Sequence, residues 1–259
     1  MVLVSLGIIT GFQPARAAIG AADTVPGATL LFPYFEVDTN SSTGVDTFLS
    51  IRNTSATAIL GHITVWTDLG YPVLTFNIYM TGYDVVSLDL RDTLVNRHLP
   101  RTASAGQDPG DTISHHGSFS QDINFASCTG QLPYPTLALN ASFASDLRSL
   151  LSGGPAVFLS GKCAGFNHGD AIARGYVTID TVNNCTQRMP GNVGYFGNGG
   201  TGDATNQNVM AGEYFLVDSG NALLHQGAAV AVQASATDPS TSDAGRYTFY
   251  GRVNSFNVA

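Results

Sequence analysis

The sequence predicts a mainly β protein, an antiparallel β-sandwich of the immunoglobulin-like or jelly-roll-like kind, with one short helix around residues 142–152 and long loops. Two observations predict this class. Strand-like segments bounded by turn residues recur roughly every 8 to 12 residues, with no long helix between them in the first third. The composition, 44% hydrophobic and only 12% charged over 259 residues, is typical of a folded chain with a large core rather than of a disordered one.

The first third of the chain has the clearest strand pattern. Residues 28–36 form an apolar run, in which Pro33 predicts either an edge strand or a bulge because proline has no N–H for the sheet ladder. Residues 45–52 and 58–67 alternate between apolar and polar side chains, and 72–80 and 83–90 are expected to follow as a pair. Within 58–67 the alternation predicts Ile63, Val65 and Thr67 on one face and His62, Thr64 and Trp66 on the other.

A helix is predicted in the middle of the chain. Asn140 or Ser142 can cap it, and Gly153 and Gly154 stop it. Its apolar face would consist of Phe143, Leu147, Leu150 and Leu151. Later strands are expected at 156–160, 175–182, 212–217, 228–234 and 246–253.

Two polar loops, 100–117 and 191–208, separate these elements, and a short helical turn is expected at 91–98. We predict a single domain over residues 18–259, with a split near 100–117 as the alternative.

The beginning of the chain predicts export. A short apolar run from Val2 to Ile9 precedes Ala15-Arg16-Ala17, an A-x-A cleavage pattern. Residues 1–17 are therefore interpreted as a signal peptide, truncated because the usual basic first region is missing; an ordinary N-terminal strand is the alternative. The mature protein would be secreted, held at the cell surface or kept in the periplasm. Because the chain stops shortly after its last predicted strand, we also expect it to continue past Ala259.

The charge of the chain argues against several partners. The formal net charge is −8 and Lys162 is the single lysine, so there is no basic stripe to neutralise phosphates and no nucleic-acid partner is expected. Anionic lipid surfaces are disfavoured for the same reason. No segment reaches the roughly 20 apolar residues that a membrane-spanning helix needs.

Three cysteines, Cys128, Cys163 and Cys185, are compatible with an oxidising compartment and lack the spacing of zinc ligands. They allow one disulfide and one leftover thiol. We prefer the pair Cys163–Cys185, because two predicted strand ends flank a short connection there. Three buried, unpaired thiols are the alternative.

One loop offers a candidate calcium site, and no other cofactor is predicted. Gly44 comes one position later than in an EF-hand loop, and Leu49 stands where that loop has glutamate. The alternative is a hairpin turn in which the Asp and Asn side chains bond their own backbone. The oxygen ligands would come from Asp38, Asn40, Ser42 and Asp46.

Catalytic patterns are weak. His115 and His116 lie in the first long loop and would need a third ligand, such as His98 or Asp111, to hold a metal. A glycosidase needs two carboxylates, for which the chain has only two glutamates, Glu36 and Glu213, beside many aspartates. The G-x-G-x-x-G match at 197–202 lacks a surrounding βαβ unit and is interpreted as a loop.

Aromatic residues offer a further candidate, a platform for carbohydrate, although core packing is the expected fate of most of them. The residues concerned are Trp66, Tyr71, Tyr79 and Tyr83.

Several segments resemble a group of uncharacterised secreted proteins from environmental bacteria. The resemblance covers mainly the first 125 residues, with weaker similarity at 214–218 and 249–252. It implies export and a β fold, and it transfers no functional residue, because that group has no assigned activity. The segments are Leu30 to Asp38, His62 to Asp68, Tyr79 to Val85 and Leu99 to Thr102.

Three classes of function follow from these patterns. The leading hypothesis is an exported, non-catalytic β-sandwich with a structural, adhesive or surface-assembly role. Such a protein could self-associate through a sheet edge or through an N-terminal strand containing Leu30, Leu31 and Phe32. The alternatives are a module that binds carbohydrate or calcium, and a secreted hydrolase that uses carboxylates or the His115–His116 loop.

Overall fold

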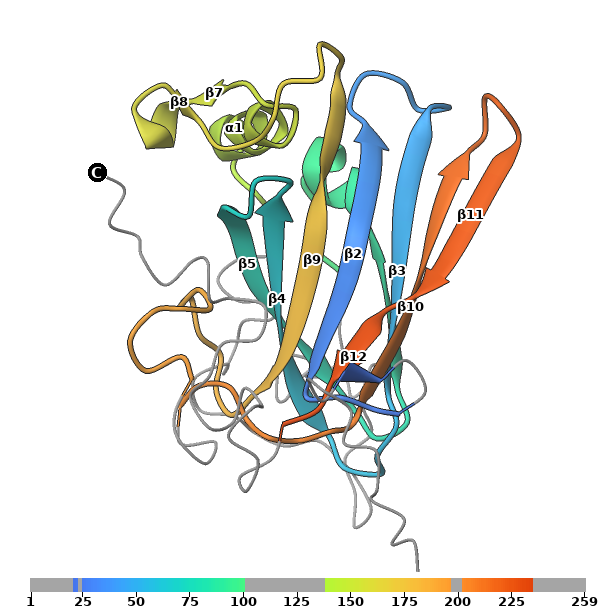
Figure 1. Ribbon diagram of the computed structural model, residues 1–259, viewed down its shortest axis with the longest axis vertical. Coiled ribbons are helices and arrows are strands. Elements are labelled where there is room, and N and C mark those ends of the chain that lie inside the picture. Colours follow the sequence, from blue (N-terminus) through green and yellow to red (C-terminus); the bar gives the residue numbers. More distant parts are fainter. Residues whose placement is uncertain (1–20, 23–24, 101–137, 197–201, 235–259) are drawn as a thin grey trace, which may run out of the picture.

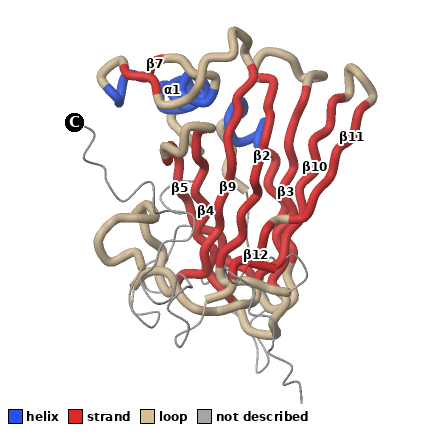
Figure 2. The backbone as a smooth tube through the Cα atoms, in the orientation of Figure 1, coloured by secondary structure: helices blue, strands red, loops and turns tan. Residues whose placement is uncertain are grey.

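The computed structural model describes residues 21–22, 25–100, 138–196 and 202–234. Within these residues the protein is mainly antiparallel β, with two sheets arranged as a sandwich (Figure 1). The predicted fold class is therefore confirmed. The tube in Figure 2 shows that the helices gather at one end of the strands. No helix among the described residues combines the length and hydropathy needed to span a membrane.

The larger sheet has six strands in the order β1-β12-β2-β9-β4-β5, and the smaller has four in the order β11-β10-β3-β6. We call them the six-stranded and the four-stranded sheet. The strands of the first are β1 (Ala21–Ala22), β12 (Val230–Val232), β2 (Thr29–Asp38), β9 (Ile172–Val182), β4 (Ile59–Thr67) and β5 (Pro72–Met80). Those of the second are β11 (Leu223–Ala228), β10 (Met210–Asp218), β3 (Val45–Asn53) and β6 (Val85–Asp89).

The core lies between the sheets because alternate residues of each strand turn their apolar side chains inward. On β2 and β3 these include Phe35, Val37, Leu49 and Ile51, each at most 1% exposed. Gly175 of β9 permits a close approach of strands, since a Cβ added there would lie 1.9 Å from the carbonyl oxygen of Trp66 on β4.

Pro33 produces a bulge, one of the two predicted outcomes. The register between β2 and β9 shifts between Phe32 and Phe35, and Pro33 lies exposed in that interval. β2 as a whole is not an edge strand, because it pairs with β9 on one side and with β12 on the other. The pairing with β12 ends at Leu31, however, so at Pro33 that side of β2 has no strand partner among the described residues. A bulge contains an extra residue that has no partner in the ladder. Proline fits there because it has no N–H that would need a partner.

The helix α1 (Ala141–Leu151) is close to the predicted range. Asn140 caps it by accepting a hydrogen bond from the Ser142 N–H at 2.9 Å, and Gly153 follows its end with φ +80°. Its buried face contains Leu147, Leu150 and Leu151 as expected.

The short helical turn expected at 91–98 is present as a π-helical turn, Asp92–Asn96. Other short elements depart from the predicted ones. The strand expected at 156–160 is replaced by β7 (Pro155–Ala156), a short 3₁₀ turn at Val157–Leu159 and β8 (Lys162–Cys163). β11 was not predicted at all, and the strand predicted at 246–253 lies outside the described residues.

Candidate functional site: the β11 edge and a polar cleft

β11 forms one edge of the four-stranded sheet and is joined to β10 by a tight hairpin. The pairing runs without a register shift from Asp218 opposite Leu223 to Glu213 opposite Ala228. In Figure 1 the β10–β11 hairpin stands at the side of the sandwich, and β11 is its outermost strand.

The direction of the backbone N–H and C=O groups of β11 follows from the hydrogen bonds made at the start of β10. Met210 exchanges hydrogen bonds with Gly27, and the Ala229 N–H donates to the Gly212 carbonyl at 2.9 Å. Even-numbered residues of β10 therefore direct their N–H and C=O toward the β11 side. Because pairing alternates along an antiparallel ladder, the even-numbered residues of β11 direct theirs away from β10. These residues are Leu224, Gln226 and Ala228.

β11 is exposed along almost its whole length. Leu223 and Leu224 are 64% and 66% exposed, and the strand sequence LLHQGA contains no Asp, Glu, Lys or Arg. An exposed, uncharged edge strand with large apolar side chains is a surface on which another strand can add.

Apolar side chains continue from β11 across the outer face of the sheet. Val217 lies opposite Leu224, and Phe215 lies opposite Phe48, which is 36% exposed. Cross-strand partners share a face, and Leu49 next to Phe48 points into the core, so this set points outward. We call Phe48, Phe215, Val217 and Leu224 the outer strip.

A cross-strand aromatic supports the hairpin from its other face. A Cβ added to Gly227 would lie 2.5 Å from the ring of Tyr214, so the ring covers this glycine. The Tyr214 ring also lies 6.1 Å from that of His225. Coverage of an edge glycine by a paired aromatic is a known way to fix strand register. The edge is therefore an ordered strand.

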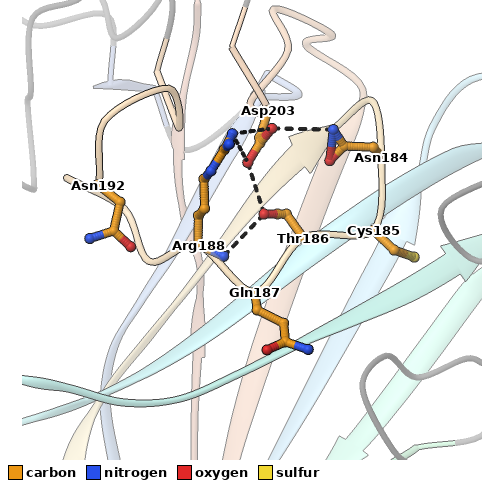
Figure 3. A pocket seen from close by; sticks show the side chains of 7 residues that line it. All are labelled: Asn184, Cys185, Thr186, Gln187, Arg188, Asn192 and Asp203. Carbon is orange, nitrogen blue, oxygen red and sulfur yellow. Dashed lines mark hydrogen bonds and ion pairs between the residues drawn. The ribbon is translucent and has the colours of Figure 1, made fainter.

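A polar cleft of about 570 Å³ lies at the other side of the molecule, in the segment after β9 (Figure 3). Buried Asp203 organises it: its carboxylate accepts hydrogen bonds from Asn184, Thr186 and Arg188 at 2.8 to 3.2 Å. The Arg188 side chain is still 53% exposed. Gln187 and Asn192 also line the cleft, which therefore offers amides and one guanidinium to a ligand.

Beneath this segment, the face of β4 predicted to carry His62, Thr64 and Trp66 is fully buried. His62 Nδ1 lies 2.9 Å from Asn77 Oδ1, while its Nε2 finds no hydrogen-bond partner within the part of the chain that the structure describes. Burial lowers the pKa of His62 to about 4, outweighing the hydrogen bond to Asn77. The imidazole is thus neutral at neutral pH and enclosed.

A second buried polar group lies on the neighbouring strands. Asp180 of β9 accepts hydrogen bonds from Thr29 and, at 2.6 Å, from the Tyr195 hydroxyl. Both donors are buried, so this carboxylate serves to fix the segment after β9 onto the sheet.

The two aspartates among the predicted calcium ligands have other partners in the structure. Asp38 Oδ1 accepts from the Asn40 and Ser41 N–H groups, so this carboxylate bonds the backbone of its own turn as the alternative predicts. The turn is not a hairpin, because β2 and β3 belong to different sheets. Asp46 Oδ1 accepts from the N–H groups of Thr47 and Arg91. No set of three or more His, Cys, Asp or Glu side chains that could hold a metal occurs in the described ranges.

Arg91 occupies the region of this loop where a cation would be expected. Its guanidinium donates to the carbonyl oxygens of Ser42, Gly44 and Val45 at 2.6 to 2.8 Å. Burial raises the pKa of Asp46 to about 6, with a further contribution from Asp89, and Arg91 opposes the rise. A calcium ion would have to displace this arginine.

The other predicted catalytic residues do not form a cluster. Glu36 on β2 is paired with Arg174 at 2.8 Å, and Glu213 belongs to β10 in the other sheet. His98 contacts Asp92 at 3.1 Å on the surface. His115, His116 and Asp111 lie outside the described residues.

The four aromatic residues of the predicted carbohydrate platform do not lie together on the surface. Trp66 and Tyr79 are fully buried, whereas Tyr83 is 69% exposed. Tyr71 lines an apolar cavity beside Phe143 of α1. Core packing therefore takes two of the four aromatics.

The preferred disulfide is wrong. Cys163 is free and exposed on β8, whereas Cys185, in the segment after β9, is disulfide-bonded. The pairing assumed that a predicted strand ends near Cys163, beside the strand that ends near Cys185. Cys163 instead lies on β8, which is only two residues long and pairs with β7. Cys128 lies outside the described residues.

Sequence reasoning missed β11 and Arg188–Asp203. The turn residues 218–221, followed by two leucines, are a signal that could have indicated the hairpin. Nothing in the spacing of Arg188 and Asp203 indicated their pairing.

Searches for similar proteins found no matching protein family, no matching curated protein and no matching solved structure.

Proposed function

We propose that the protein is an exported, non-catalytic β-sandwich with a structural or surface-assembly role, and that it associates with a strand of another protein chain through the edge of β11. The observation that carries the proposal is the β11 edge itself: three outward-directed N–H and C=O pairs on an uncharged strand with two large exposed leucines. Export rests on the Ala15-Arg16-Ala17 pattern.

The contrast with β2 supports a role for the β11 edge. Beyond Leu31, the flank of β2 on the β12 side has no strand partner among the described residues. There the Thr47 hydroxyl accepts from the Glu36 N–H at 3.1 Å and donates to the Glu36 carbonyl at 2.8 Å. Together with Pro33, this contact prevents another strand from pairing.

The edges formed by β5 and β6 are also less available than β11. β5 is buried at all but one position, and β6 is bounded by Asp84 and Asp89. Proteins usually blunt their free edges with charge, proline or coverage. None of these devices occurs on β11 in the described part of the chain.

Two buried groups with displaced pKa values, His62 and Asp46, support a non-catalytic role. His62 is enclosed in the interior, and Asp46 is held by Arg91 and backbone N–H groups. An active site would instead place such groups in a cleft open to substrate.

The experiment compares Gln226→Pro with Gln226→Thr in the cells that produce the protein. Proline removes an N–H that points away from β10, so the hairpin keeps its own bonds, whereas threonine keeps the N–H. We expect the proline variant to be released in soluble form and the threonine variant to stay in sedimentable surface material. Equal retention of both variants would refute the proposal.

A second candidate is binding of a polyhydroxylated ligand such as a glycan in the polar cleft. The observation in its favour is that Asp203 holds Arg188 in place while that side chain remains half-exposed beside the amides of Asn184 and Gln187. Calorimetry with a glycan panel tests it, using Arg188→Ala against the exposed Val193→Ala as a matched control. Absence of heat with the parent protein would remove this candidate.

A further inference from the structure

We infer that the strand that adds to β11 is β11 of a second copy of this chain, giving a twofold dimer with a continuous eight-stranded sheet. This inference rests on the proposed function, because it names the partner of the same edge. It follows from the direction of the backbone groups, the distribution of charge and the outer strip.

Two copies of β11 can pair only in certain registers. When a twofold axis perpendicular to the sheet relates two antiparallel strands, side chains that lie on one face in the first copy lie on the same face in the second. Side chains alternate between the two faces, so each residue lies opposite a residue whose number differs from its own by an even amount. The hydrogen-bonded positions must be those that direct their backbone outward, namely Leu224, Gln226 and Ala228. Placing Gln226 opposite its counterpart uses all three positions and forms six interchain hydrogen bonds.

This register also joins suitable side chains. Leu224 of one copy lies opposite Ala228 of the other on the outer face, so a large side chain meets a small one at both ends of the pairing. Because Phe215 lies opposite Gln226 in each copy, the outer strips of the two copies approach each other on either side of the paired Gln226 side chains. On the opposite face, His225 lies opposite Gly227 of the other copy, where the Tyr214 ring already covers the glycine.

The distribution of charge permits a second copy at this edge. With a net charge of −8, most pairs of surfaces on two copies repel each other. β11 carries no acidic side chain, and the acidic residues of β10, Glu213 and Asp218, stand at the two ends of the hairpin. β11 therefore allows close approach of two copies without placing like charges opposite each other.

The mass of the purified protein in solution, measured by sedimentation velocity, tests the inference. We expect a dimer for the parent and for Gln226→Thr, and a rise in the dimer Kd of roughly 10- to 100-fold for Gln226→Pro, which removes two interchain N–H donors. Leu224→Lys, a change at an exposed position that leaves the fold intact, should also weaken the dimer. A parent that stays monomeric overturns the inference, as does a dimer that none of these variants affects.

Crosslinking tests the register in a Cys163→Ser background, so that the free thiol is absent. In the register given above, Gln226→Cys places two Cα atoms about 5.5 Å apart, within the range of a disulfide. Leu223→Cys, also exposed, would lie about 20 Å from its counterpart. We expect an interchain disulfide for the first variant only, and the reverse result would overturn the register.

The two proposals fail in different ways. If the purified parent is monomeric but surface retention still depends on the Gln226 N–H, β11 pairs with a different protein: the proposed function stands and the second copy is wrong. If retention does not depend on that N–H, the proposed function itself fails.

Discussion

Two buried titratable groups should give opposite contributions to the pH dependence of stability. The folded-state pKa of His62 is lowered from 6.5 to about 4, and that of Asp46 is raised from 3.8 to about 6. Below pH 6.5 the unfolded chain protonates His62 while the folded protein does not, so acidification destabilises the fold. Between pH 6 and pH 3.8 the folded protein protonates Asp46 while the unfolded chain does not, so acidification stabilises it.

The sizes of the two contributions follow from the same pKa values. Between pH 7 and pH 4 the His62 contribution removes about 3 kcal/mol from the free energy of unfolding, and the Asp46 contribution adds about 2 kcal/mol. The two contributions to the free energy of unfolding largely offset each other, so the pH dependence of the parent protein alone would reveal neither of them clearly.

Single variants separate the two contributions. The chain has one tryptophan, the buried Trp66, whose fluorescence reports urea unfolding. We expect the stability advantage of the parent over His62→Gln to fall by about 3 kcal/mol from pH 7 to pH 4. Relative to Asp46→Asn, the parent should gain about 2 kcal/mol over the same range. Differences that do not change with pH, or that change in the same direction for both variants, would refute the reasoning.

Four further substitutions, one of them a control, test the packing of the fold by urea unfolding at pH 7. Gly175→Ala should cost about 3 kcal/mol because the new Cβ would overlap the Trp66 carbonyl, whereas Gly161→Ala, with open space but φ +79°, should cost about 1 kcal/mol; equal costs would contradict this. Asn140→Ala should cost about 1 kcal/mol through loss of the α1 cap, and no change would show that the cap contributes nothing. Arg91→Gln should cost about 2 kcal/mol by freeing three carbonyl groups. Millimolar calcium should leave the parent midpoint unchanged, and a rise would show that calcium displaces the arginine.

The sandwich could be predicted because its main strands alternate regularly. Residues 59–67 form β4 almost as expected, and the apolar residues Ile63 and Val65 point into the core between the sheets. Pro33 was correctly interpreted as a source of irregularity, but the sequence alone did not decide between an edge and a bulge. That choice depends on which strands lie beside β2, and the strand on one side, β12, comes from nearly 200 residues further along the chain.

The candidate site was harder to predict than the fold. β11 has only two large apolar residues, followed by His225, Gln226 and Gly227, so it lacks the alternation by which strands are recognised. Its importance comes from its position at the edge of the sheet, and edge position is a property of the topology. The calcium loop shows the opposite error: its local pattern was correct as a turn, but Arg91, some 45 residues away, supplies the positive charge.

The burial of the two sheets shows where contacts with other molecules can form. Alternation in β4 predicted one face turned away from the core, yet His62, Thr64 and Trp66 on that face are fully buried, as is Tyr79 on β5. At these positions the six-stranded sheet is covered on both sides. The outer side of the four-stranded sheet instead exposes Phe48, and its edge exposes both leucines of β11. A partner that needs apolar contact area and free backbone groups finds both on the four-stranded sheet, which is why assembly through β11 explains the exposure pattern better than a ligand site on the larger sheet.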